Sequence, residues 1–429
     1  MGEIATITDA WPIICSFPWL LEANRNARKG KRYRQEVMVF AAKLEDNLLL
    51  ILEGMLNGDY ELGPYRKLWV YVPKKRLVMA LPFPDRIVQW ALYQYLNPIF
   101  DKLMIEDSYG CRKNKGSHKA VKRLQYWMRQ IDRKPGADWY VLKLDISKYF
   151  YRVHHEKLLQ VLEKRIKDPE LMRFLRVVVN SRAEPFGLPR GKGPQDVPPE
   201  EWLYDVGMPI GNLTSQMFAN IYLNELDQFC KHTLRIHHYI RYMDDVIILA
   251  PDKATLHQWK DRIEVFLRDV LELDLNRKTS IRPMRQGVEF VGVRVWPTHI
   301  KLRKSTVGRL KREIRKISED YAAGILSQEG FDRRIASANG LLEHVESASL
   351  RHRLNEIYRA ALLKEEAAMK EEADREPSTD HRKSGNGRGG AGEGHSDIGS
   401  QACGAGGHRD RAGRNSRGRR RVSPGDWAV

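Results

Sequence analysis

The sequence predicts an α+β fold followed by an all-helical segment, and three observations support this class. Short runs in which apolar and polar residues alternate, as in strands, are interspersed with runs of helical period. The two kinds of run do not follow the regular strand–helix–strand rhythm of a doubly wound sheet. Beyond Ser305 the pattern stays helical to about Met369. We therefore expect a mixed domain first and a helical domain after it.

Composition and charge narrow the class of function. The chain has 429 residues, of which 42% are apolar, enough for two or three packed units. A formal charge of +18 and an isoelectric point near 9.6 favour a polyanionic partner. The cysteines Cys15, Cys111, Cys230 and Cys403 are too scattered for a disulfide framework or a zinc knuckle, which favours a reducing cytoplasm. Neither a membrane span nor a signal peptide is predicted.

The C-terminal segment differs in composition from the rest of the chain. From Pro377 onward, ten basic residues face five acids among many glycines, and large apolar side chains are rare. Such a segment cannot bury enough surface to offset the entropy lost on ordering, so we expect disorder over residues 370–429. Without the segment from Pro377 the rest of the chain still carries +13. The basic character therefore belongs to the folded part.

The elements expected along the chain follow from these periodicities and from turn residues. Those of the first part are a basic stretch at 25–34, a helix from about 35 to 56, two strands at 67–83 joined by a basic tip, helices at 85–100 and 117–131, and a buried strand at 139–145. Those that follow are helices at 154–166 and 169–180, a Pro/Gly-rich connector at 184–206, a turn and helix at 207–229, a helix at 253–271, a strand near 279 and a hairpin at 290–303.

Two adjacent acids interrupt the strongly apolar stretch "YIRYMDDVII". Because the flanking residues prefer extended structure, Asp244 and Asp245 are expected at the tip of a β-hairpin, and an ordinary solvated turn is the alternative. Asp145, which ends the strand "VLKLD", favours a functional site. Carboxylates held close together repel one another unless a hard cation such as Mg²⁺ neutralises them. Two such ions ~4 Å apart can support in-line phosphoryl transfer.

A set of motifs, in order, resembles the reverse transcriptases. "KLDISKYF", "GMPIGNLTSQ", "RYMDD", "LDLNRKTSI" and "FVG" are similar to the successive palm motifs of this family, and "RLVMALPFPDRIVQWAL" and "SYGCRKNKGSHKA" are similar to its fingers motifs. The resemblance covers roughly residues 32–362. It implies a right-hand RNA-directed DNA polymerase with fingers at 1–138, a palm with an antiparallel sheet at 139–303, a helical thumb at 304–369 and the disordered tail.

The resemblance assigns the catalytic residues by position. Asp145 and Asp244 match the two metal-binding aspartates, with Ile146 beside them in the metal site, and Asp245 is their less directly involved neighbour. Two Mg²⁺ ions are implied, for which Mn²⁺ can substitute. Lys278 resembles the lysine proposed to protonate the pyrophosphate leaving group, and the alternative is a surface cation.

The substrate-binding residues follow in the same way. Lys75 and Arg76, on the basic tip, match the fingers residues at the incoming triphosphate, and a solvated basic turn is the alternative. Phe150 matches the bulky gate against a ribose 2′-hydroxyl, and core packing beside Tyr149 is the alternative. The run Phe290, Val291 and Gly292 resembles the primer grip.

The block "IGNLTSQ" narrows the family further. Many bacterial reverse transcriptases begin this block with Gln-Gly and end it with Ser-Pro, whereas Ile210 and Gly211 with Gln216 at the end are typical of diversity-generating retroelements. Such enzymes copy a template-repeat RNA with frequent errors opposite adenine, and the cDNA replaces a variable repeat in a target gene. The resemblance implies template RNA, primer or cDNA, dNTPs and a basic accessory variability protein, assembled as a ring, as partners.

Other interpretations remain open on the sequence. "DRIVQWAL" is closer to intron-type enzymes, and the long Gly/Arg tail is unusual for the retroelement group. For Ile210 the alternative is simple packing of the helix start. A palm-fold RNA scaffold without catalysis is disfavoured because all three acids are present. A nucleotide cyclase-like palm is disfavoured by the fingers and thumb regions and by the basic charge.

Overall fold

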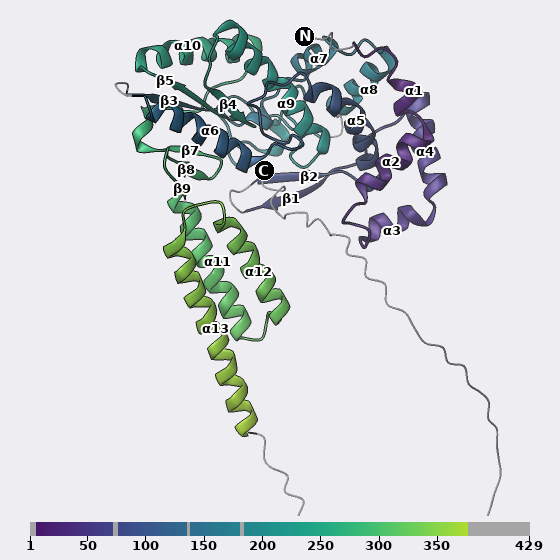
Figure 1. Ribbon diagram of the computed structural model, residues 1–429. Coiled ribbons are helices and arrows are strands. Elements are labelled where there is room, and N and C mark those ends of the chain that lie inside the picture. The colour runs from purple at the N-terminus through teal and green to yellow at the C-terminus, as the bar shows by residue number, and fades with distance from the viewer. Residues whose placement is uncertain (1–5, 72–75, 135–137, 181–183, 376–429) are drawn as a thin grey trace, which may run out of the picture. The chain divides into compact units, whose positions relative to one another are not determined.

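The computed structural model describes residues 6–71, 76–134, 138–180 and 184–375 (Figure 1). The chain divides into two units, one formed by residues 1–307 with 343–346 and the other by 308–342 with the chain from 347 onward. Lys74, Lys75 and the segment from Pro377 lie outside the described residues. Among the residues described, none of the helices is both long and apolar enough to cross a membrane.

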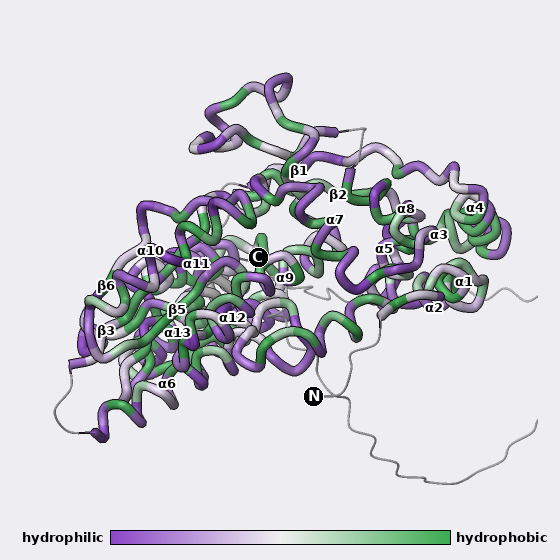
Figure 2. The backbone as a smooth tube through the Cα atoms, turned by 90° about the horizontal axis from the view of Figure 1, so that it is seen from above, coloured by the Kyte–Doolittle hydropathy of each residue, from purple (hydrophilic) through white to green (hydrophobic). Residues whose placement is uncertain are grey.

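A four-stranded antiparallel sheet forms the centre of the first unit. Its strand order is β4 (Tyr239–Tyr242), β5 (Asp245–Ala250), β3 (Tyr140–Asp145) and β6 (Ser280–Pro283). Successive side chains of a strand point to opposite faces. In β5 Val246 and Ile248 therefore enter one core, while Ile247 enters another. Apolar residues recur along β5 in Figure 2, as expected for a strand that is covered on both faces.

Helices cover the two faces of this sheet. On the first face α9 (Leu213–Gln228) and α10 (Lys253–Val270) contribute to the larger core. On the second face α6 (Ser117–Asp132) packs against β4 and shares the smaller core with a second sheet. That sheet consists of β7 (Val288–Phe290), β8 (Val293–Val295) and β9 (Ile300–Leu302).

The second sheet corrects one expectation. Residues 290–303 were expected to form a single hairpin, but they belong to a three-stranded meander that begins at Val288. The extra strand exists because Val291 and Gly292, with φ of 44° and 82°, form a tight turn that folds β7 back onto β8. Positive φ at both turn residues is the geometry that suits a two-residue hairpin, although it is unfavourable for a β-branched valine.

The N-terminal helices and the hairpin β1 (Arg66–Val70) and β2 (Arg76–Ala80) group on one side of the first unit (Figure 1). The helices are α1 (Trp11–Ile14), α2 (Phe17–Ala27), α3 (Gln35–Ala42), α4 (Leu44–Asn57) and α5 (Phe83–Asp101). Helix α5 packs against both α2 and α9 and so connects this group to the central sheet. The pair of strands with a basic tip is confirmed in its described part.

Two differences from the expected elements occur here. The helix expected from about 35 to 56 is broken at Lys43, whose φ of −130° and ψ of 54° are not helical. The Asn47 side chain donates a hydrogen bond to the Phe40 carbonyl at the end of α3, which stabilises the break. Helix α2 was not predicted. Farther along, α7 (His155–Glu163) and α8 (Pro169–Val179) occur where two helices were expected.

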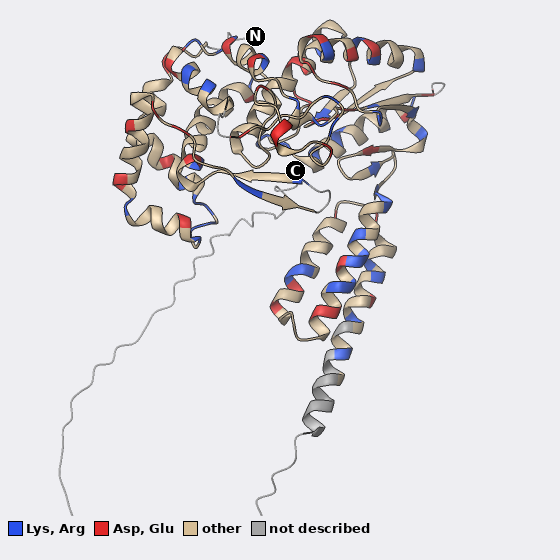
Figure 3. Ribbon diagram, turned by 180° about the vertical axis from the view of Figure 1, so that it is seen from behind, with Lys and Arg blue, Asp and Glu red and all other residues tan. Residues whose placement is uncertain are grey.

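The second unit is helical. It contains most of α11 (Lys304–Ala322), α12 (Gln328–Leu342) and α13 (Ala348–Arg375). Its core includes a stack in which the Phe331 ring lies 4.2 Å from that of Tyr321 and 5.2 Å from that of Tyr358, measured between centroids. Figure 3 shows many Lys and Arg residues along these helices. The change to helical structure after the second sheet agrees with the periodicity of the sequence.

Candidate active site

Strand pairing brings the three predicted acids together. Asp145, the last residue of β3, lies directly opposite Asp245, the first residue of β5. Tyr242 pairs with Asp245 across β4 and β5, so Met243 and Asp244 form the two-residue turn between these strands. Met243 has a φ of 54°, which this turn requires. The predicted hairpin is confirmed, with Asp244 in its turn and Asp245 on its second strand.

A cavity of about 400 Å³ opens beside these acids. It brings Asp145, Asp244 and Asp245 together with Arg76 from β2 and Lys278 from the segment before β6. The rest of its lining comes from β3, β6, the second sheet and the residues just before β7 and α11: Val141, Lys143, Ser280, Arg282, Pro283, Gly287, Val288, Glu289, Arg294 and Arg303. Five residues proposed from four separate sequence motifs thus converge on one space with both acidic and basic walls.

Burial and neighbouring negative charges disfavour the ionised forms of Asp244 and Asp245. The pKa of Asp244 is raised to about 6, mainly by burial and also by the nearby charges of Asp145 and Asp245, while Arg76 partly opposes the rise. Burial also raises the pKa of Asp245, against the opposing effect of Lys143. The cavity therefore favours either a proton or a cation at the acids.

The donor set can be compared with the needs of a metal ion. In the described part of the chain, three or more His, Cys, Asp or Glu side chains nowhere gather into a metal-binding group. Mg²⁺ commonly takes only one or two carboxylates and completes its shell with water and substrate phosphates, so the paired acids fit this ion. Asn276 N–H donates to the Asp145 carbonyl and Ser147 N–H to the Asp274 carbonyl. This bridge leaves the carbonyl of Ile146, between them, unused by the pairing.

Lys143 is a site residue that sequence reasoning missed. Its Nζ lies 3.0 Å from Asp245 Oδ1 and also donates to the Glu289 carbonyl at 3.0 Å. It thus neutralises one acid and connects that acid to β7. The sequence did indicate that Lys143 lies near the acids, because it stands two residues before Asp145 in a strand and so shares its face of the sheet.

The block that begins with Ile210 packs directly on the strand that carries Arg76. Met79 N–H of β2 donates to the Ile210 carbonyl at 2.8 Å. Gly211 has a φ of 127°, and a Cβ there would lie 2.7 Å from the Met79 carbonyl oxygen, so no larger residue fits without movement. Gln216 is half-buried in the first turns of α9. These residues lie outside the cavity lining, but they support the β2 strand that enters it.

The remaining predicted residues divide between the cavity and the core. Lys278 is exposed and lines the cavity. Phe150 is half-buried against the larger core, with its ring centroid 5.6 Å from that of Tyr149, and is not part of the cavity lining. Phe290 is fully buried, so the accessible part of the primer-grip motif is the turn formed by the half-buried Val291 and the exposed Gly292.

Comparison with known proteins identifies the family. The family model described as "Reverse transcriptase (RNA-dependent DNA polymerase)" matches residues 71–295, more than half of the chain. Protein YkfC of Escherichia coli is 27% identical over 320 residues, covering 65% of this chain and 80% of the relative. The group II intron-encoded protein LtrA of Lactococcus lactis is 23% identical over 368 residues, covering 68% of this chain and 57% of that protein.

Solved structures similar to this chain include a telomerase from Candida albicans bound to an RNA fragment. That similarity has a TM-score of 0.39 at 13% identity and covers 73% of this chain and 57% of the telomerase chain. A telomerase from Candida tropicalis gives a TM-score of 0.40 at 13% identity, covering 65% of this chain and 52% of that one. The family model alone decides the assignment, and it agrees with the polymerase fold class expected from the order of the motifs. The chain belongs to the reverse transcriptase family of RNA-dependent DNA polymerases.

Proposed function

We propose that this reverse transcriptase serves a diversity-generating retroelement, copying a template-repeat RNA into error-containing cDNA. The polymerase part rests on one observation, the cavity in which Asp145, Asp244 and Arg76 converge. The subgroup rests on the block from Ile210 to Gln216, which departs from the Gln-Gly and Ser-Pro pattern of many other bacterial enzymes.

In this proposal the two metal-binding acids are Asp145 and Asp244, with the Ile146 carbonyl as a further ligand. Bound Mg²⁺, or Mn²⁺ in its place, would supply activation of the primer 3′-hydroxyl and neutralisation of charge on the phosphates. Asp245, which is paired with Lys143, would hold the turn in place instead of binding metal. This division of roles is supported by the ion pairs of the described residues, where Asp245 alone among the three acids has a cation at ion-pair distance.

Basic side chains around the acids would bind the substrate phosphates. Arg76 Nη1 is buried and has no hydrogen-bond partner among the described residues, so it is available to a triphosphate oxygen. Lys75, beside it in sequence, would add a second positive charge. Lys278, exposed on the cavity wall, would give a proton to the pyrophosphate that leaves.

The remaining motif residues would act on the sugar and the primer. Phe150 would exclude a ribose 2′-hydroxyl, which requires its half-buried ring to border the nucleotide once it is bound. Val291 and Gly292 would contact the primer end from their turn, and the buried Phe290 would anchor that turn in the core. The corresponding regions would be fingers at 1–138, palm at 139–303 and thumb at 304–369.

Low fidelity opposite template adenine would depend on Ile210. A branched apolar side chain cannot hydrogen-bond, so a mispair would lose fewer contacts relative to the correct pair than in an enzyme with Gln at this position. Discrimination depends on that difference in transition-state free energy, with ~1.4 kcal/mol per tenfold in selectivity. The hydrogen bond from Met79 to the Ile210 carbonyl supports this role, since it couples the turn to the strand that carries Arg76.

Sequencing of cDNA made from a defined RNA template tests the subgroup. We expect errors concentrated at template adenines in the wild type and a reduced adenine bias in Ile210→Gln. Ile325→Gln is a matched control, because Ile325 is an exposed isoleucine of the second unit. Errors spread evenly over the four template bases, or an adenine bias unchanged in Ile210→Gln, would contradict this proposal while leaving the polymerase assignment intact.

Partners follow from charge and from the subgroup. Template RNA, primer or cDNA and dNTPs would bind the basic protein, and RNA affinity should fall steeply with salt because phosphate contacts release counterions. A small basic accessory protein that forms a ring would complete a ribonucleoprotein in the cytoplasm. Efficient, correctly placed priming on arbitrary RNA by the purified chain alone would argue against that accessory protein.

An intron-type reverse transcriptase is the second candidate. The similarity to the intron-encoded protein LtrA and the "DRIVQWAL" segment favour it. The DNA that flanks the gene distinguishes the two functions. A pair of near-identical repeats that differ mainly at template adenines indicates a diversity-generating element, whereas a flanking intron RNA structure indicates the alternative.

A further inference from the structure

The turn that carries Asp244 is held in an unfavourable conformation. Met243 has a φ of 54°, and the carboxylate that follows it lies near two others that repel it. Neither property stabilises the turn by itself, because a non-glycine residue at positive φ and neighbouring like charges both cost free energy. Some other group must therefore fix the position of Asp244.

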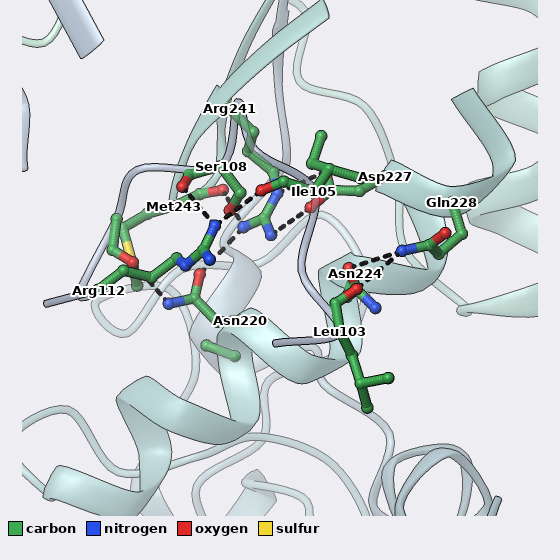
Figure 4. Close-up of polar contacts among 12 residues, drawn as sticks. Leu103, Ile105, Ser108, Arg112, Asn220, Asn224, Asp227, Gln228, Arg241 and Met243 are labelled. Atoms are coloured by element: carbon green, nitrogen blue, oxygen red, sulfur yellow. Dashed lines mark hydrogen bonds and ion pairs between the residues drawn. The ribbon is translucent and has the colours of Figure 1, made fainter. Parts of the chain in front are cut away.

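The guanidinium of Arg241 meets this requirement through a hydrogen bond to the backbone of the turn. Arg241 is fully buried, as is its ion-pair partner Asp227. Its Nε and Nη2 donate to the two carboxylate oxygens of Asp227 at 2.7 and 2.6 Å. Its Nη1 donates to Asn220 Oδ1 and to the backbone carbonyl of Met243, both at 3.1 Å. The planar fork thus connects helix α9 directly to the backbone of the turn (Figure 4).

A loop distant in sequence holds the same turn from another side. Tyr109 N–H donates to the Arg241 carbonyl at 2.9 Å, and Asn220 Nδ2 donates to the Gly110 carbonyl at 2.7 Å. A Cβ at Gly110 would lie 2.7 Å from Met243 N, so this glycine permits close approach of the loop to the turn. Asn220 therefore bonds both to the loop and to the guanidinium.

The location of this ion pair indicates more than a contribution to stability. Replacing a fully buried pair with well-packed apolar residues is often neutral or stabilising, so burial alone does not explain it. What an apolar replacement could not reproduce is the hydrogen bond to the Met243 carbonyl. That carbonyl belongs to the peptide unit that leads into Asp244.

We propose that Arg241, held by Asp227 and Asn220, is a positioning residue that sets the distance between the carboxylates of Asp244 and Asp145. The proposal rests on the proposed function, in which these acids bind the divalent cations. Loss of the bond to the turn should let the two like charges move apart, which weakens cation binding without altering any ligand. Groups that orient metal ligands typically contribute 10–100-fold to metal affinity.

The test compares Arg241→Lys with Tyr239→Phe in the full chain. Lysine keeps the charge beside Asp227 but cannot also reach two further acceptors. Tyr239→Phe removes a 2.6 Å hydrogen bond to the same Asp227 carboxylate and does not touch the turn, so it is a matched control for stability. Mn²⁺ binding is measured by electron paramagnetic resonance with a primer that ends in a dideoxynucleotide, which prevents chemistry, and unfolding temperatures are measured in parallel.

We expect Arg241→Lys to weaken Mn²⁺ binding by about tenfold and Tyr239→Phe to leave it unchanged, even where both lower the unfolding temperature. The affinity for primer–template should stay the same in both. Unchanged Mn²⁺ binding in Arg241→Lys, or an equal loss in Tyr239→Phe at equal stability, overturns the proposal. If Arg241→Lys does not fold, Asn220→Ser takes its place with the same outcomes. A wild type that binds Mn²⁺ but makes no cDNA would refute the proposed function alone.

Discussion

Replacing Asp244 with Asn should abolish metal-dependent cDNA synthesis and, at the same time, stabilise the metal-free protein. The amide keeps the shape of the carboxylate but loses the charge that would hold the metal. It also removes a charge that is buried next to Asp145 and Asp245, both of which raise the pKa of Asp244. Activity and stability therefore change in opposite directions.

The size of the stabilisation follows from the pKa. The pKa of Asp244 rises from an ordinary value of 3.8 to about 6 in the folded protein. Each unit corresponds to ~1.4 kcal/mol, so the charged form costs about 3 kcal/mol of stability. Because the folded protein holds this proton more tightly than the unfolded chain does, stability falls as pH rises from about 4 to about 6 and is constant above that. Asp244→Asn has no carboxylate at this position, so its stability does not fall for this reason as the pH rises.

Thermal unfolding in chelator-treated buffer provides the assay. At about pH 7.5 we expect Asp244→Asn to unfold roughly 4 °C above the wild type, and at about pH 4 the difference should vanish. Added Mg²⁺ should raise the midpoint of the wild type but not that of the variant. Asp59→Asn, at an exposed carboxylate outside the cavity, controls for the general effect of removing a negative charge. A variant that is less stable than the wild type at neutral pH, or a gain that does not depend on pH, would refute the electrostatic reasoning.

Three further predictions concern the surroundings of the acids. Lys143→Met should lower the free energy of unfolding, measured by chemical denaturation, by about 1–2 kcal/mol. The loss should be smaller at about pH 5 than at about pH 8, because protonation of Asp245 removes the charge that Lys143 no longer compensates. Gly211→Ala should lower the free energy of unfolding by about 1–3 kcal/mol and raise the KM for dNTPs. Gly191 also has a positive φ but has open space for a Cβ, so Gly191→Ala should lower the free energy of unfolding by about 1 kcal/mol and leave the KM unchanged. Phe150→Val should increase ribonucleotide incorporation in primer extension by roughly tenfold or more, and an unchanged ratio of rNTP to dNTP use would assign this ring to the core alone.

Much of the fold could be predicted because its periodic segments are long. The strand at 139–145 and the helices at 85–100 and 117–131 occur within about two residues of their expected bounds. The break at Lys43 could not be predicted, since apolar residues continue at helical spacing through it and the stabilising bond comes from a side chain, Asn47, beyond the break. Helix α2 was missed because its sequence, "FPWLLEANRNA", turns polar halfway along.

Part of the candidate site could also be predicted from the sequence, and part of it could not. Asp145 and Asp244 could be predicted to meet because each stands at a strand end with a characteristic neighbourhood. The ion pair of Arg241 with Asp227 was missed, although each charge occupies a position where the pattern calls for an apolar residue. A buried charge requires a partner. Two such opposite charges, one on a predicted strand and one on a predicted helix, therefore indicate a contact that periodicity alone does not reveal.

The three carboxylates at the centre of the site are compensated to different extents, and this difference supports the separate roles proposed for them. Asp245 has Lys143 at 3.0 Å, so its charge is already balanced within the protein. Among the described residues, the cation that acts on Asp244 is the more distant Arg76, and the pKa of Asp244 is raised to about 6, mainly by burial. A cation that enters the cavity therefore gains most from binding beside Asp244 and least beside Asp245. Arg241 donates a hydrogen bond to the turn that carries this uncompensated acid, and in the proposed function a bound cation would relieve the electrostatic cost of holding the acid there.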